Sequence, residues 1–423
     1  MLKKNKKDVQ WRRLDNSAKI FPLASSRKYS SVYRLSAVMK ENINPKILED
    51  AVEKTVNKYA FFKVRLKQGF FWYYFEDNPK KVIIEEEIDY PCKYIDPNVN
   101  NSYLFKITFF ERKINIDIFH SLTDGNTAVQ FFKEIIYTYI ETLHPDEFKS
   151  DSRSEKKINF DTEDSYLKNY NKKIKNDNNS KKAYALKGNK ILFNAIAVTH
   201  EIIDLNKLKE IVQSKNVTMT QYLTAVLIYT IYNENYKESK SKRPIKICIP
   251  VNLKKYFKSQ TVNNFFSYIT VEANMRDKNM QSFDDILNFV KENFENKLKE
   301  DEIIKTMSAN VKLGNNAFIR IIPLFLKKIF VKLSYIEIRK YTTTTFSNIG
   351  RIGIISEYTK YIDNFLFLIA PETVEKIKCS ACSYEDKMIF TFTSILNNKY
   401  IENGFCEFLK SQGINVNIES NGV

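Results

Sequence analysis

Histidine, glycine and cysteine are scarce in this sequence of 423 residues, and each scarcity narrows the possible chemistry. Three histidines leave few candidates for an imidazole general base. The nine glycines form no Gly-x-Ser-x-Gly elbow, which argues against a hydrolase of that kind, and residues 350–353 lack the spacing and lysine of a phosphate-binding loop. The five cysteines are odd in number and irregularly spaced, which suits a reducing cytoplasm. Cys379 and Cys382 have no second pair nearby, so we expect no metal site.

Long apolar runs are missing as well. Residues 1–7 are basic but no apolar run follows them, so we expect no secretory signal. The most apolar stretch, residues 318–335, is interrupted by Arg320, Pro323 and three lysines, which excludes a membrane span. This stretch could lie on a surface, but we favour a core helix with a basic solvent face. The sequence therefore predicts a cytoplasmic protein without stable membrane insertion.

Charge of one sign is in excess. The 67 Lys and Arg exceed the 50 Asp and Glu, for a net charge of +17. The lysines are scattered along the chain, which favours solvated faces over a nucleic-acid interface, so we predict no nucleic-acid partner. A local patch for a phosphorylated small molecule needs only a few of these cations. The abundance of Lys, Asn, Ile, Tyr and Phe is typical of a low-GC bacterial genome.

The hydrophobic pattern predicts a mixed α/β fold in two lobes. We expect an N-terminal lobe over residues 1–150, a solvated crossover linker over 151–190, and a C-terminal lobe over 191–423. Strands are expected at residues 31–38, 61–66, 70–75, 103–110, 114–120, 191–203, 245–250 and 265–271. Helices are expected after Asn44-Pro45 and after the turn 121–125, the latter with an apolar side that runs from Val129 to Leu143. Further helices are expected at 205–214 with Asp204 as cap, at 218–232, and after a capping box of Ser282 and Asp285.

His120 differs from the other two histidines in its setting. The alternation over residues 114–120 places it on the same strand face as Ile114, Ile116 and Ile118, immediately before a strand-to-helix turn that reads Ser-Leu-Thr-Asp-Gly. Strand ends beside loops are where α/β proteins often place reactive groups. A core histidine followed by an Asx-Gly turn is the structural alternative, but the pattern His-x-x-x-Asp-Gly favours function. His144 and His200 are expected to be structural or solvent-facing.

At this motif the chain resembles the chloramphenicol acetyltransferase-like superfamily, which includes peptide-synthetase condensation domains and alcohol acetyltransferases. Softer likenesses to the bacterial alcohol acetyltransferase branch lie, in the same order, at residues 11–15, 69–74, 250–257 and 347–350. The likeness spans nearly the whole chain. Condensation domains usually carry a second histidine before the first, and Phe119 stands there in this sequence.

The resemblance implies two related lobes with an active-site tunnel between them. It implies that His120 is the general base that takes the proton of an alcohol or amine as that group attacks an acyl-coenzyme A thioester, without an acyl-enzyme intermediate or a resident cofactor. Asp124 is expected to point away from substrate and to pair with a cation, with Lys63 or Arg65 as candidates. Gly125 is expected to permit a backbone geometry or close approach that a side chain would block.

Substrate-binding residues are sought in the second half of the chain. Ser347 and Asn348, after the threonine run 342–345, form the best polar cluster for a developing oxyanion, although that run is equally a β-branched strand. Asn252 could line the tunnel or merely end a strand. Lys254, Lys255 and Lys258 are candidates for the phosphates of coenzyme A. Two alternatives stay open, namely amide or ester formation from a carrier-protein thioester, and a catalytically silent binding or scaffold protein.

Overall fold

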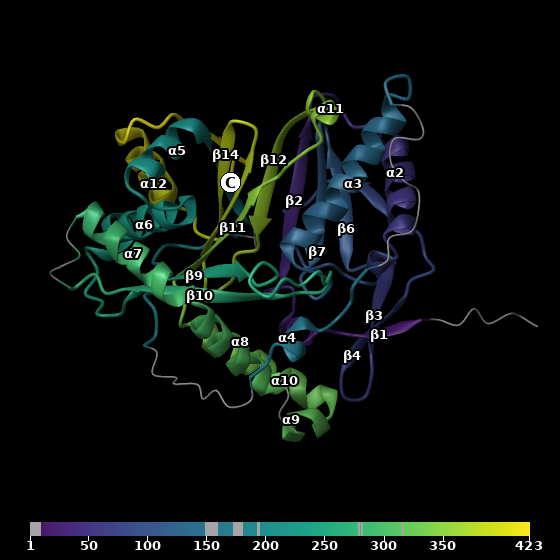
Figure 1. The fold of residues 1–423 in the computed structure, drawn as a ribbon, viewed down its shortest axis with the longest axis horizontal. Helices are drawn as coiled ribbons and strands as arrows, with labels where there is room; N and C mark the ends of the chain where they lie inside the picture. Colours follow the sequence, from purple (N-terminus) through teal and green to yellow (C-terminus); the bar gives the residue numbers. More distant parts are fainter. Residues whose placement is uncertain are drawn as a thin grey trace, which may run out of the picture.

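Three β-sheets organise the chain. A computed structural model describes residues 10–148, 160–171, 181–192, 195–277, 280, 282–314 and 317–423. In the order of their strands, the sheets are β1-β4-β3, β12-β2-β7-β6-β5 and β10-β9-β11-β13-β14-β8-β15. The predicted mixed α/β class is confirmed. Figure 1 shows the five-stranded sheet on one side of the molecule and the seven-stranded sheet on the other, each with helices on its outer side.

The first half of the chain builds the five-stranded sheet and most of its cover. Helix α2 begins where expected, since Asn44 Oδ1 accepts hydrogen bonds from the N–H groups of Lys46 and Ile47, and Pro45 holds the first helical position. The elements of this half are β1 (Trp11–Arg13), α1 (Phe21–Ala24), β2 (Val32–Met39), α2 (Pro45–Lys58), η1 (Ala60–Phe62), β3 (Val64–Gln68), β4 (Tyr73–Asp77), β5 (Ile84–Glu86), β6 (Phe105–Phe110), β7 (Lys113–Phe119) and α3 (Gly125–Leu143). Helices α2 and α3 pack together over one face of this sheet and close the first hydrophobic core (Figure 1).

The second half builds the seven-stranded sheet. The predicted caps at Asp204 and Ser282 are confirmed, and Thr218 caps the helix that follows it as well, because each of these side chains accepts a backbone N–H of its helix. The elements are α4 (Ser165–Lys168), β8 (Ala197–Asp204), α5 (Leu205–Ser214), α6 (Met219–Ile231), η3 (Tyr232–Tyr236), β9 (Ile245–Asn252), β10 (Phe266–Ala273), α7 (Phe283–Lys297), α8 (Glu300–Gly314), α9 (Ala317–Ile321), α10 (Leu324–Arg339), β11 (Thr344–Arg351), α11 (Ser356–Thr359), β12 (Ile362–Ile369), β13 (Ile377–Tyr384), β14 (Lys387–Ser394), α12 (Tyr400–Ser411) and β15 (Val416–Ser420). Helices α5, α6, α7 and α12 cover this sheet and close the second core.

One strand crosses between the halves. Strand β12 belongs to the C-terminal half by sequence but pairs with β2 over nearly its full length, so it forms the edge of the N-terminal sheet. Its outer face packs on β13, whose Ser380 and Cys382 donate hydrogen bonds to the carbonyls of Phe367 and Phe365. The expected boundaries at residues 150 and 191 therefore divide the sequence, but they do not divide the sheets, because β12 from the second half belongs to the N-terminal sheet.

Four expectations about single segments need correction. The strand expected at 61–66 begins only at Val64, because residues 60–62 form the short helix η1. The strand expected at 191–203 begins at Ala197, because residues 195–196 are irregular. Of the expected solvated linker, the most polar run lies outside the described residues, and the segment 160–171 is anchored by Tyr166, whose hydroxyl donates to the Phe266 carbonyl at 2.7 Å. Helix α10 is not a core helix, because its apolar side chains are largely exposed.

Candidate active site

His120 stands one residue beyond the end of β7, at the turn that leads into α3. Its backbone N–H donates to the Ser31 carbonyl at 2.9 Å, which extends the pairing between β7 and β2. The imidazole stacks on Phe21 with ring centres 4.7 Å apart and meets the edge of Tyr33 at 5.1 Å. The residue as a whole is half-buried.

The turn that carries the His-x-x-x-Asp-Gly motif is held by loops of both halves. Ser121 Oγ donates to the Ala18 carbonyl at 3.0 Å, and Thr123 Oγ1 donates to the Val262 carbonyl at 2.7 Å. Leu122 is fully buried in the first core. A buried hydroxyl needs a partner, so these bonds define one path for the backbone from His120 to α3.

Asp124 uses both carboxylate oxygens. Oδ1 accepts the Thr127 N–H at 3.1 Å and so caps α3, and Oδ2 lies 2.7 Å from Lys254 Nζ. Lys254 also donates to Thr127 Oγ1 at 2.9 Å. The cation paired with Asp124 is therefore Lys254 from the second half, which corrects the expectation of Lys63 or Arg65.

The two cations that were expected there have other partners. Lys63 Nζ donates to Asn57 Oδ1 at 2.7 Å, and Arg65 pairs with Glu76 at 2.6 Å. Both side chains lie on or beside the β3–β4 hairpin, whose residues form a separate small sheet. The ion-pair partner of Asp124 therefore comes from a loop more than a hundred residues further along the sequence, not from the strands near it in sequence.

Gly125 does not need to be glycine for the reason that was expected. Its backbone is not in the left-handed region, and a Cβ built on it would lie 3.4 Å from Ile349 Cγ2. That separation is ordinary van der Waals contact for a single methyl group. The close approach of β11 to the start of α3 is real, but alanine would fit it.

A chain of hydrogen bonds reaches His120 from Asp15 through Asn264. Asp15 Oδ2 accepts both the backbone N–H and the Nδ2 amide of Asn264 at 3.2 Å, and Asp15 Oδ1 accepts the Ala18 N–H at 2.8 Å. With its amide nitrogen turned to the carboxylate, Asn264 presents Oδ1 to His120 Nδ1 at 3.1 Å. An amide oxygen only accepts, so the neutral imidazole carries its proton on Nδ1 and leaves Nε2 free.

Burial shifts the pKa values of the ionisable groups in this series of hydrogen bonds. Desolvation lowers the pKa of His120 below its ordinary 6.5, although Asp124 and the bond to Asn264 act in the opposite direction. Desolvation also raises the pKa of Asp15 to about 7 against the effect of its three N–H donors. At neutral pH the imidazole is therefore an uncharged base.

A half-exposed face of the second sheet lies beside the imidazole. Phe266 on β10 lies with its ring centre 5.1 Å from that of His120. Strand pairing places Asn252 opposite Phe266, and Thr345 opposite Cys248, so by alternation Ser347 shares this face. The intervening residues of the same strands, such as Phe346 and Ile249, are buried in the second core. This half-exposed face of the second sheet therefore contacts His120 through Phe266.

Of the polar residues expected to bind substrate, Asn252 and Asn348 already have hydrogen-bond partners within the protein. Asn252 Oδ1 accepts the Lys254 N–H at 3.0 Å, so it ends the strand and orients the loop of Lys254. Asn348 Nδ2 donates to Thr220 Oγ1 and its Oδ1 accepts the Gly350 N–H. In the part of the chain that the structure describes, the Ser347 hydroxyl is half-exposed and has no hydrogen-bond partner.

The threonine run before Ser347 has structural roles. Thr343 Oγ1 donates to the Tyr184 carbonyl, Thr344 Oγ1 to the Ile377 carbonyl, and Thr345 Oγ1 to Glu375 Oε2. These hydroxyls join β11 to its neighbours and leave Ser347 as the available donor of this strand.

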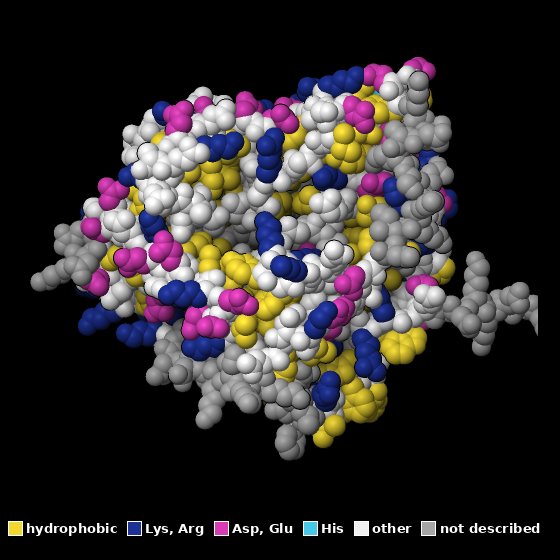
Figure 2. Space-filling view, viewed as in Figure 1, with side chains coloured by type: hydrophobic (Ala, Val, Ile, Leu, Met, Phe, Trp, Pro, Cys, Tyr) yellow, Lys and Arg dark blue, Asp and Glu magenta, His cyan; other side chains and the backbone are white. Residues whose placement is uncertain are grey.

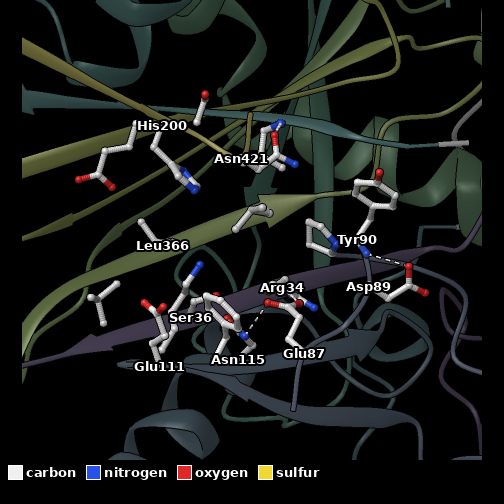
Figure 3. Close-up of a pocket in the computed structure, with 18 of the residues that line it drawn as sticks. Arg34, Ser36, Glu87, Asp89, Tyr90, Glu111, Asn115, His200, Leu366 and Asn421 are labelled. Carbon is white, nitrogen blue, oxygen red and sulfur yellow. Dashed lines mark hydrogen bonds and ion pairs between the residues drawn. The ribbon is translucent and has the colours of Figure 1, made fainter. Parts of the chain in front are cut away.

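A cleft among the described residues lies elsewhere, at the opposite end of β2 and β7. It has a volume of about 740 Å³ and is lined by Arg34, Glu87, Asn115 and, across the opening, His200 and Asn421 (Figure 3). Arg34 is bound to Asp117 at 2.5 Å, and His200 Nδ1 lies 2.8 Å from Thr391 Oγ1. None of the expected site residues lines this cleft. The contact with Thr391 agrees with the expectation that His200 is structural or faces solvent.

Asp15 and Asn264 are the two residues of the arrangement that sequence reasoning missed. Asp15 lies in a segment that carried part of the family resemblance, but no local pattern connects it to His120. Asn264 follows another asparagine just before β10 and looks like an ordinary loop residue. Both are buried, at 3% and 0% exposure, and only the fold brings them together.

Known protein structures share the fold of this chain, although no similar sequence was found. No protein-family model and no curated protein sequence matches the chain. A first condensation domain of the calcium-dependent antibiotic synthetase has a TM-score of 0.65 at 10% identity, covering 95% of this chain and 96% of that one. Trichothecene 15-O-acetyltransferase from Fusarium sporotrichioides has a TM-score of 0.63 at 10% identity over 95% and 94%. A second F. sporotrichioides protein, TRI101, crystallised with coenzyme A and T-2, has a TM-score of 0.60 at 10% identity over 93% and 96%. The chain has the two-lobe fold of these proteins.

Proposed function

We propose that the chain is an acyltransferase that moves an acyl group from a coenzyme A thioester to a small alcohol, with His120 as general base. The observation that carries this proposal is the hydrogen bond from His120 Nδ1 to Asn264 Oδ1, which leaves Nε2 unprotonated beside a half-exposed face of the second sheet. The fold adds support, since it includes an acetyltransferase and a protein crystallised with coenzyme A. The alcohol as acceptor rests on the resemblance to alcohol acetyltransferases.

The proposed reaction needs one base and one hydrogen-bond donor. His120 Nε2 takes the hydroxyl proton as the acceptor oxygen attacks the thioester carbonyl. The carbon–sulfur bond of the resulting intermediate then breaks, and the imidazolium returns the proton to the departing thiolate, which leaves as free coenzyme A. Ser347 is our candidate donor to the oxyanion, because its hydroxyl has no hydrogen-bond partner among the described residues and because it shares the sheet face on which Phe266 contacts His120. The atoms balance without an acyl-enzyme, a metal or a resident cofactor.

The phosphates of coenzyme A need cations that are not already paired. Lys254 is committed to Asp124, so it is withdrawn from that role. Lys255 and Lys258 are exposed in the turn that follows β9 and stay candidates.

The test is acceptor-dependent release of free thiol from acetyl-coenzyme A, measured with a panel of alcohols and amines and checked by mass spectrometry of the acylated product. A parallel incubation replaces acetyl-coenzyme A with an acylated carrier protein. Thiol release with alcohols supports the proposal. Consumption of the carrier thioester alone would transfer the assignment to condensation chemistry. If neither donor is consumed, the chain is a silent binding or scaffold protein and the proposal fails.

A further inference from the structure

Helix α10 is oriented with its apolar side toward solvent. Phe325, Ile329 and Leu333, spaced by one helical turn, are 62%, 56% and 63% exposed, whereas Lys327 on another side of the helix is 2% exposed. This distribution reverses the usual placement of hydrophobic and charged residues. The exposed stripe therefore needs a reason that intramolecular packing does not supply.

Polar contacts hold the helix in this orientation. Lys327 Nζ donates to the Phe71 carbonyl at 2.9 Å and lies 3.6 Å from the centre of the Trp72 ring. The Leu324 N–H donates to the Phe70 carbonyl at 3.0 Å. At the other end of the helix, Arg339 pairs with Glu375 at 2.9 Å. Both ends are thus fixed, and the tip of the β3–β4 hairpin lies against the start of α10.

The helix and the hairpin tip form one patch, which we call the α10 surface. It consists of Ile321, Phe325, Ile329, Phe330, Leu333 and Phe70, of which Ile321 and Phe70 are 68% and 72% exposed. Figure 2 shows hydrophobic side chains gathered with Lys and Arg at the lower edge of the molecule, where Figure 1 places α9, α10 and the hairpin. Contiguous exposed apolar side chains of this kind mark an interaction surface.

The two segments that form the α10 surface carry charge of one sign. Residues 319–336 and 64–75 contain no Asp or Glu, and the first of these segments contributes Arg320, Lys328 and Lys332. The first acid on the helix, Glu337, pairs with Lys182 at 2.7 Å and with Lys340 at 2.6 Å. A partner of this surface must therefore offer an apolar layer bordered by negative charge.

We propose that the α10 surface docks on the face of an anionic phospholipid bilayer. Aromatic and aliphatic side chains would enter the boundary between headgroups and acyl chains, and the cations would meet the phosphates. Within the described ranges, no helix is both long and apolar enough to cross a bilayer, so the contact is peripheral. Helix α10 also packs on α1, whose Phe21 stacks on His120, so docking would bring that wall of the site near the lipid. The proposal does not depend on the proposed acyl transfer.

The experiment measures partition of the full chain onto vesicles by flotation. Vesicles of phosphatidylcholine alone are compared with vesicles that also contain phosphatidylglycerol. We expect much stronger binding to the anionic vesicles, weakening as salt rises. Phe325→Ser with Ile329→Ser should lower the partition coefficient by roughly tenfold. The matched control is Ile88→Ser with Val99→Ser, two side chains that are 94% and 67% exposed outside the α10 surface.

The charge contribution is tested by reversal. Lys328→Glu with Lys332→Glu should reduce binding to anionic vesicles by roughly tenfold or more, whereas Lys46→Glu with Lys54→Glu, two exposed lysines on α2, should change it far less. All substituted side chains are exposed or half-exposed, and unchanged thermal melts would show that the variants fold.

Three results would overturn the proposal. The first is the absence of binding to anionic vesicles. The second is equal loss of binding in the α10 variants and their controls. The third is a dimer in sedimentation velocity that Phe325→Ser with Ile329→Ser dissociates while vesicles bind no protein, since a second copy would then cover the surface.

Discussion

Buried carboxyl groups at two places in the molecule differ in whether they have hydrogen-bond or ion-pair partners. Around His120, Asp15 accepts three N–H groups and Asp124 pairs with Lys254. In the second sheet, Glu201 on β8 and Glu402 on α12 are 0% and 2% exposed. Among the described residues, neither oxygen of Glu201 nor Oε2 of Glu402 has a hydrogen-bond partner.

The two places resemble each other in pKa and differ in geometry. Desolvation raises the pKa of Asp15 and of Glu402 to about 7 alike, and it raises that of Glu201 well above its ordinary value. A shifted carboxyl group therefore does not by itself identify a site. The hydrogen bonds that lead from Asp15 through Asn264 distinguish His120 from these carboxyl groups, because they leave its Nε2 without a proton, as the proposed reaction requires.

The largest expected effect is a loss of acyl-transfer activity that occurs on substitution of His120 but not on substitution of ionisable groups elsewhere. His120→Ala should lower acyl transfer by roughly 10² to 10⁴-fold, the usual contribution of a general base, with a nearly unchanged melt. Glu402→Gln and His200→Ala should change turnover little. The measurement is release of free coenzyme A. Equal losses of activity in all three variants, or unfolding of His120→Ala, would remove the distinction.

The second effect concerns stability. Asp124→Ala should lower the free energy of unfolding by about 3 to 5 kcal/mol, because Lys254, with a side chain 14% exposed, loses its counter-charge. The rate should fall too, since the same carboxylate caps α3. Urea denaturation measures the change, with Lys254→Met as the partner variant. If the double variant loses as much as the sum of the two singles, the pair is not coupled.

The third effect is a pH dependence of stability that arises from the buried carboxyl groups Glu201 and Glu402, and it is tested at Glu402. The pKa of Glu402 is raised from 4.5 to about 7, so its contribution to stability is complete below about pH 4.5 and is lost as the pH rises to about 7. Glu402→Gln keeps the uncharged form, so at pH 8 it should be more stable than the parent by roughly 2 to 3 kcal/mol. The gain should vanish near pH 4. A gain that is independent of pH would show that ionisation is not its cause.

The smallest effect tests the chain from Asp15. Asn264→Leu should reduce kcat by about tenfold with little change in KM, because the imidazole loses the acceptor that selects its tautomer. The bond to Asn264 raises the pKa of His120, so its removal should move the acid limb of the pH–rate profile to lower pH. A lower kcat with an unmoved limb would indicate a structural role only.

The local structure around His120 could be predicted from the sequence. Alternating isoleucines identified β7, Asp124 and Gly125 marked the start of α3, and Asn44-Pro45 marked that of α2. Each of these signals acts over a few residues, through side-chain alternation or a cap on the nearest N–H groups. The same reasoning failed for α10, where an apolar stripe was assumed to face the core and instead faces outward.

The sequence by itself determined where most strands and helices lie, and that a histidine stands at a strand end before a turn into a helix. Only the tertiary structure decided what surrounds that histidine. Lys254, Asn264 and Asp15 are separated by up to 249 residues, and the pairing of distant strands brings them to one point. The physical reason is range, because propensity and capping act between chain neighbours, whereas the partner of a buried charge is whichever group the packing of the sheets brings within reach.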